Sequence, residues 1–106
     1  MALPTVPEPG LDSILSHYGD FIDNSVEPYI AELYRVSTLD EKTKELVVTA
    51  LLALRGWRTG VRVHARHAVD AGATPDEVRG AILITMGIGG MAAAAEALTW
   101  ADEVLS

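Results

Sequence analysis

The sequence DEKTKELVVTALLALRGWRTGVRVHARHAVDAGAT, residues 40–74, decides the fold of this chain. The run that follows Glu45, LVVTALLAL, is apolar on nearly every side of a helix, which is typical of a central helix. Gly56 stands where a left-handed residue would end that helix, and Gly72 stands in the same relation to the helix that follows. The stretch therefore predicts two helices that can pack as an antiparallel hairpin.

Two side chains of this hairpin carry possible chemistry. Glu45 is a carboxylate at the start of the most apolar run, and His64 follows nineteen residues later on the second helix. If the hairpin brings them together, the carboxylate can hold the imidazole in one tautomer and stabilise its charged form for proton transfer. A structural interpretation is also open, in which His64 is a core histidine and Glu45 is a first-turn carboxylate favoured by the helix dipole.

The N-terminal third of the chain also predicts helices. Apolar residues recur at three- and four-residue spacing over residues 11–22 and 26–35, with a break expected at residues 23–25. Residues 1–10 are rich in proline and predict an extended arm. We expect residues 11–106 to form a single helical domain.

Helix start and stop signals divide the rest of the chain. Thr38-x-x-Glu41 and Thr74-x-x-Glu77 each fit a capping box, and Pro75 suits the first helical position. The second box opens a helix to about Met86. A break is then expected at residues 87–90, before an alanine-rich final helix. No segment alternates like a strand, so we predict an all-α fold, a helical bundle around the central hairpin.

Composition narrows the function classes. The 106 residues suit one domain, and a formal net charge of −7 argues against nucleic-acid binding, which needs a basic surface. The chain has no cysteine, which excludes disulfides and thiol nucleophiles and fits a cytoplasmic protein. We expect no signal peptide and no membrane span. With 49% apolar residues, many of them alanine, we expect a homo-oligomer.

The stretch from about Leu39 to Leu98 resembles the carboxymuconolactone decarboxylase family, which includes the alkylhydroperoxidase D-like proteins. The likeness rests on LDEKTKELVVTALLAL, on H-x-x-x-A-x-x-A-G-A-T-x-x-E from His64 to Glu77, on AILITM, and on G-x-G-G before an alanine-rich helix. The resemblance implies an all-helical subunit around a central hairpin, commonly assembled as a trimer or hexamer. It also implies a small-molecule substrate.

Matches to the two branches of the family are incomplete. The peroxidase branch has a C-x-x-C motif where this chain has Trp57 and Gly60, so the resemblance does not extend to thiol peroxidase activity. The proton relay of that branch matches at Glu45 and His64, but its second histidine would fall on Thr59. The decarboxylase branch lacks the cysteines and is the nearer analogue, although it tends to carry a histidine at the Thr59 position too.

Four further residues come into question for substrate binding, and Arg62, Trp57 and Thr59 are the predicted ones. Arg62 could hold a substrate carboxylate, for which the planar guanidinium fork is suited, or it could belong to a solvated face or a subunit salt bridge, and Arg66 is open to the same interpretations. Trp57 either caps a pocket or fills it. Thr59 stands where the relay histidine is missing and would line the same pocket.

His67 follows His64 by three residues, a spacing that can chelate a metal with Glu45 as a third ligand. The H-E-x-x-H context of known metal helices is absent, so the sequence predicts no metal site and no cofactor, with His67 a solvated or interface residue. His17 has no such context and is expected at the surface.

Our leading hypothesis is an enzyme of the carboxy-lyase type. It would decarboxylate or isomerise a small carboxylated molecule by cofactor-independent acid–base chemistry at Glu45 and His64. One alternative is a non-catalytic structural or regulatory subunit in which Trp57 fills the old pocket. Another is a small-ligand binding protein. A solvent-connected cavity at His64 would favour the enzyme, and a packed, dry region around Trp57 would favour the non-catalytic subunit.

Overall fold

The computed structural model describes residues 11–105, and the prediction of an all-α fold is confirmed, since all regular secondary structure in that range is helical. The arm predicted over residues 1–10 lies outside the described residues. The chain divides into two compact units, one up to Thr38 and one from Leu39 onward. A single domain over residues 11–106 stays a prediction.

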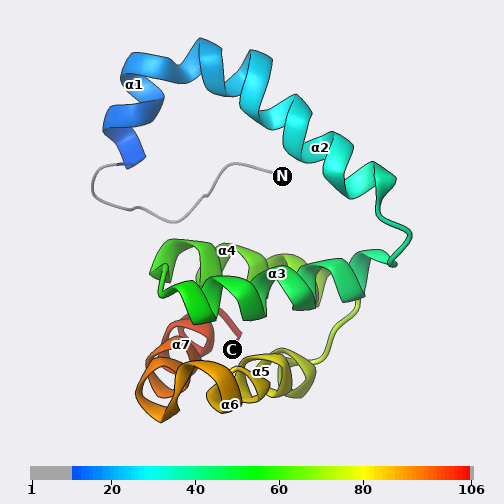
Figure 1. Cartoon of the computed structure of the whole chain (residues 1–106), viewed down its shortest axis with the longest axis vertical. Helices are drawn as coiled ribbons and strands as arrows, with labels where there is room; N and C mark the ends of the chain where they lie inside the picture. The colour runs from blue at the N-terminus through cyan, green and yellow to red at the C-terminus, as the bar shows by residue number, and fades with distance from the viewer. Residues whose placement is uncertain (1–10, 106) are drawn as a thin grey trace. The chain divides into compact units, whose positions relative to one another are not determined.

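The first unit is a bent run of helix. Helix α1 (Leu11–Phe21) is kinked at Tyr18, a turn of π-helix follows (η1, Ile22–Val26), and α2 (Glu27–Val36) continues from it (Figure 1). The break predicted at residues 23–25 is therefore wrong. A proline ring clashes with the carbonyl four residues earlier in a regular α-helix, and the wider π turn before Pro28 relieves that clash without ending the helix.

The second unit is built on the predicted hairpin. Helices α3 (Glu41–Arg55) and α4 (Arg58–Asp70) lie side by side in antiparallel directions, and the other helices of this unit gather on one side of them (Figure 1). Those helices are α5 (Pro75–Ile84), α6 (Met86–Gly89) and α7 (Met91–Leu105). The core between them is rich in alanine, whose small side chain lets the helix axes approach closely: Ala53, Ala65, Ala68, Ala97 and Ala101. The larger buried apolar side chains are Val61, Val78 and Ile82.

The start of α3 differs from the prediction. The capping residue is Asp40, whose carboxylate accepts the N–H of Thr43 at 2.8 Å, so the capping box assigned to Thr38 is wrong. The chain is still extended at Asp40 (φ −70°, ψ 165°), which leaves Thr38 two residues too early to reach the free N–H groups of the first turn. The left-handed ends predicted at Gly56 (φ 82°) and Gly72 (φ 105°) are confirmed.

The glycine-rich segment before α7 is only partly a break. The N–H groups of Gly89 and Gly90 donate to the carbonyls of Thr85 and Met86, so α6 is helical and the chain turns only at Gly90 (φ 91°). The prediction of a break over all of residues 87–90 is therefore wrong. A Cβ on Gly89 would lie 2.5 Å from a methyl carbon of Leu54, so glycine here allows α6 to approach α3.

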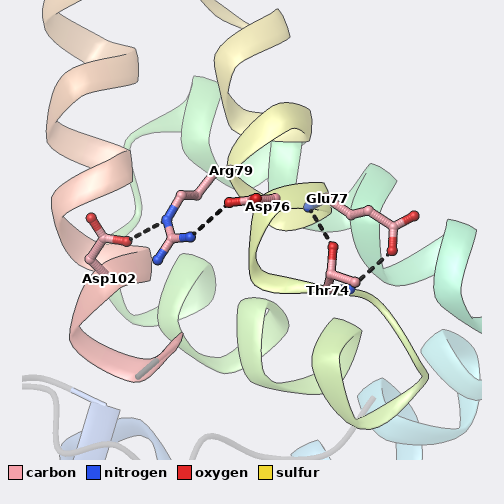
Figure 2. A network of polar contacts seen from close by, with 5 residues as sticks. All are labelled: Thr74, Asp76, Glu77, Arg79 and Asp102. Atoms are coloured by element: carbon pink, nitrogen blue, oxygen red, sulfur yellow. Dashed lines mark hydrogen bonds and ion pairs between the residues drawn. The ribbon is translucent and has the colours of Figure 1, made fainter.

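Helix α5 begins at the predicted capping box. The Thr74 hydroxyl accepts the N–H of Glu77 at 3.1 Å, and the Glu77 carboxylate accepts the N–H of Thr74 at 3.0 Å (Figure 2). In the same view, Arg79 on α5 bridges Asp76 and Asp102, which ties α5 to α7 (Figure 2). The other Glu77 oxygen lies 3.1 Å from the Lys42 ammonium, which ties α5 to α3.

Stability should fall in acid partly through Glu77. The Thr74 N–H and then the Lys42 ammonium hold the pKa of Glu77 below its ordinary 4.5, so this carboxylate stabilises the fold above that pH and loses its contribution as pH falls through the lowered value. We expect Glu77→Gln to show a smaller loss of unfolding free energy between neutral and acid pH, measured by urea unfolding. Glu96→Gln, an exposed glutamate on α7, is the control. Equal acid sensitivity of Glu77→Gln and wild type would contradict this role.

Several large apolar side chains of the second unit remain exposed, among them Ile84 (78%), Ile88 (82%) and Met91 (70%). Contiguous exposed apolar side chains commonly mark contact surfaces, which fits the expected homotrimer or homohexamer, and that assembly stays a prediction. In the part of the chain that the structure describes, every helix is too short or too polar to cross a membrane.

Candidate acid–base site

The centre of the site is a contact between the two hairpin helices. The Nδ1 atom of His64 on α4 lies 2.6 Å from a carboxylate oxygen of Glu45 on α3, which is a short hydrogen bond. Both residues are buried, with 1% of His64 and 7% of Glu45 exposed. The meeting of Glu45 and His64 that the nineteen-residue spacing suggested is therefore observed.

The register of α3 explains why a carboxylate points into the hairpin. The buried residues of α3 are Glu45, Thr49 and Ala53, one turn apart on one face. The Thr49 hydroxyl donates to the backbone carbonyl of Glu45 at 2.7 Å. On the remaining faces Val47 and Leu51 are exposed, so the most apolar part of the central helix is not its buried face. The inward face is the polar one, which the sequence pattern did not reveal.

His67 is the third member of the site. It lies almost one turn after His64 on α4, its ring is 5.2 Å from the His64 ring in an edge arrangement, and its Nδ1 is 3.9 Å from the same Glu45 oxygen. Its side chain is 30% exposed, against 2% for the side chain of His64. The site is therefore partly exposed to solvent at His67, and this side is called its wet edge. The expectation that His67 is only a solvated or interface residue missed this position, although its three-residue spacing from His64 was visible.

Arg62 is engaged elsewhere. Its Nε lies 3.2 Å from the Glu103 carboxylate on α7, which Arg58 also contacts at 2.8 Å. Arg62 precedes His64 by two residues, so its side chain leaves α4 roughly 200° around the helix from the imidazole. The structure does not bring Arg62 to the Glu45–His64 pair, and its role in substrate binding stays a prediction. Arg66 pairs with Asp70 at 3.2 Å.

Trp57 covers the first turn of α4. A Cβ on Gly60 would lie 2.6 Å from the Trp57 ring and 2.8 Å from a methyl carbon of Leu52, so both side chains close over this glycine. The Arg55 guanidinium lies over the indole, 5.7 Å from its centre. Thr59 is fully buried beside it in the chain. These contacts favour the interpretation that the Trp57 side chain fills the pocket over the interpretation that it caps an open one.

The three polar side chains can serve two kinds of chemistry. Glu45 and His64 form an acid–base pair in a dry environment, with His67 at the edge toward solvent. Oxygen and nitrogen donor atoms of Glu45, His64 and His67 also all lie within 4.8 Å of one another, close enough to be considered as ligands of one metal ion.

The comparisons with known proteins agree on one family. The model of the carboxymuconolactone decarboxylase family matches residues 25–103. A crystal structure of a protein from Burkholderia xenovorans LB400, named as a candidate carboxymuconolactone decarboxylase, superposes with a TM-score of 0.69 at 26% identity. The superposition covers 92% of this chain and 78% of that chain. No curated protein shows a significant match to the chain.

Proposed function

Because the chain belongs to the carboxymuconolactone decarboxylase family, we propose that it performs cofactor-independent acid–base chemistry on a small carboxylated organic molecule. The reaction would be a decarboxylation or an isomerisation. The observation that carries the proposal is the buried 2.6 Å contact between Glu45 and His64. A carboxylate that orients an imidazole is an arrangement that supports general acid–base catalysis.

The ring nitrogen not bonded to Glu45 would be the reacting one. In a decarboxylation beside a carbonyl, the bond to the carboxylate carbon breaks, carbon dioxide leaves, and the electron pair is delocalised into the carbonyl. The His64 imidazolium then donates its Nε2 proton to the carbon and becomes neutral, while Glu45 keeps the Nδ1 proton in place. Isomerisation would use the same atoms, with His64 removing a proton from one carbon and returning it to another.

A second function has its own supporting observations. His64 is only 1% exposed, and Trp57 closes over Gly60 in the space where the peroxidase branch has its cysteines. In a non-catalytic oligomeric subunit, the Glu45–His64 hydrogen bond would satisfy two buried polar groups and nothing more. A small-ligand binding protein would use the wet edge at His67 without turnover.

The test is an assay of the wild-type protein with carboxymuconolactone and related lactone acids in D2O. Decarboxylation should release carbon dioxide and leave deuterium on the carbon that lost it, and isomerisation should incorporate deuterium without gas release. Either signal above the rate without protein supports the enzyme. Absence of both signals across the panel would count against the enzyme and favour the non-catalytic subunit.

A further inference from the structure

We propose that Glu45, His64 and His67 form a binding site for one divalent first-row transition ion of the zinc or cobalt type. Two imidazoles and one carboxylate meet from two helices, with donor atoms within 4.8 Å of one another. The sequence offers the same three ligands but no H-E-x-x-H context, and on that ground it predicts no metal site. The structure adds the observation that all three donor atoms lie close together across the hairpin.

Of the two measured distances between the Glu45 oxygen and the histidine nitrogens, one is shorter and the other longer than the separation of two ligand atoms in a metal site. Donor atoms bound to one tetrahedral zinc ion at about 2.0–2.1 Å are separated by about 3.4 Å. The Glu45 oxygen is 2.6 Å from the nitrogen of His64 and 3.9 Å from that of His67, so one distance must lengthen and the other shorten by less than an ångström. The His67 ring is partly exposed and the Glu45 carboxylate sits on a flexible side chain, which makes this adjustment small.

The chemistry of the donor set selects the ion. Imidazole nitrogens suit zinc, cobalt and iron, whereas magnesium and calcium prefer sites made of oxygen alone. The ion would take the place of the proton between His64 and Glu45. That proton would be released to solvent, and His64 would bind the ion through Nδ1 as the neutral ring that keeps its proton on Nε2. A fourth position would point toward the exposed edge at His67, where water or a ligand could bind, as in open zinc sites.

The ion and the acid–base pair would exclude each other, because both use Nδ1 of His64 and the Glu45 carboxylate. This inference therefore goes beyond the proposed function and does not depend on turnover. Metal binding can be measured on a protein that catalyses nothing, and turnover can be measured in chelator.

The experiment is a titration of the untagged, metal-free protein with Co²⁺, followed by visible absorption, and with Zn²⁺, followed by calorimetry. We expect one ion per chain. His67→Ala and the ring-preserving His67→Phe should each weaken binding by more than about 100-fold, the upper end of what loss of a supporting residue costs. The control is His17→Ala, which removes the remaining histidine of the three in the chain and should bind as wild type does.

Circular dichroism of each variant shows whether the helices are intact. The site would be overturned by no binding at one ion per chain in the folded wild type, or by equal affinity in wild type and in both folded His67 variants. Loss of binding in His17→Ala alone would place the ion elsewhere and would overturn it as well.

Discussion

Replacing His64 by glutamine should lower turnover by roughly 10²–10⁴-fold, the range that a positioned general acid or base contributes. The glutamine amide can still donate a hydrogen bond to the Glu45 carboxylate, so the buried contact across the hairpin is kept. What the variant loses is an ionisable ring that carries a proton to the substrate. The measurement is kcat and kcat/KM on whichever lactone acid the wild type converts, in chelator to keep metal ions away.

His17→Gln is the matched control, because it makes the same change at an exposed histidine on α1. It should keep wild-type kinetics. Thermal unfolding of both variants separates a chemical loss from a loss of fold. If His64→Gln turns over at the wild-type rate with its fold intact, His64 is not the proton donor, and the carboxylate of Glu45 becomes the remaining candidate for that role.

The hairpin was predictable because its signals are local. The apolar run of α3, the left-handed glycines at its end and at the end of α4, and the capping box at Thr74 each act within a few residues. The nineteen-residue spacing of Glu45 and His64 then suggested a meeting once an antiparallel hairpin was assumed, and the measured 2.6 Å contact agrees. Spacing along two helices that pack against each other is therefore enough to suggest a pair.

The features that the sequence did not predict depend on tertiary context. Asp40 and Thr38 are both good capping residues. Asp40 is the N-cap because the backbone stays extended up to that residue and becomes helical at Glu41. A π turn and a continuing helix at Pro28 compete closely with a break, and sequence does not distinguish them. The partner of Arg62 was also not predictable, because Glu103 lies on a helix more than forty residues later, and the role of Arg62 in substrate binding stays a prediction.

His67 shows the same limit within the site itself. Its relation to His64 is visible in the sequence, but its distance to Glu45 depends on the rotation of α4 against α3. A rotation of one residue, about 100°, would have turned His67 to solvent and left the pair as an isolated hydrogen bond. Helix-to-helix rotation is fixed by core packing, here by Val61, Ala65 and Ala68, and not by the spacing of the polar residues.

Removing the polar pair altogether should leave the fold standing. Glu45→Met alone leaves a buried imidazole N–H without its acceptor, and we expect a loss of about 1–3 kcal/mol in unfolding free energy. His64→Leu alone leaves a buried carboxylate without its main partner, and we expect a loss of about 3 kcal/mol or more. The double variant has neither orphan group, so its unfolding free energy should return to within about 1 kcal/mol of wild type or exceed it.

The measurement is a double-mutant cycle by urea unfolding at neutral pH. The summed single losses exceed the loss expected for the double variant by about 3 kcal/mol or more, and that difference is the expected interaction energy between the two sites. Glu96→Met combined with His64→Leu is the control cycle, because Glu96 is an exposed residue of α7, and it should be additive. A double variant that is as stable as wild type but inactive would mean that the pair is retained for its chemistry, since the core does not need it. A double variant as unstable as the sum of the single changes would instead make the pair a structural element and favour the non-catalytic subunit.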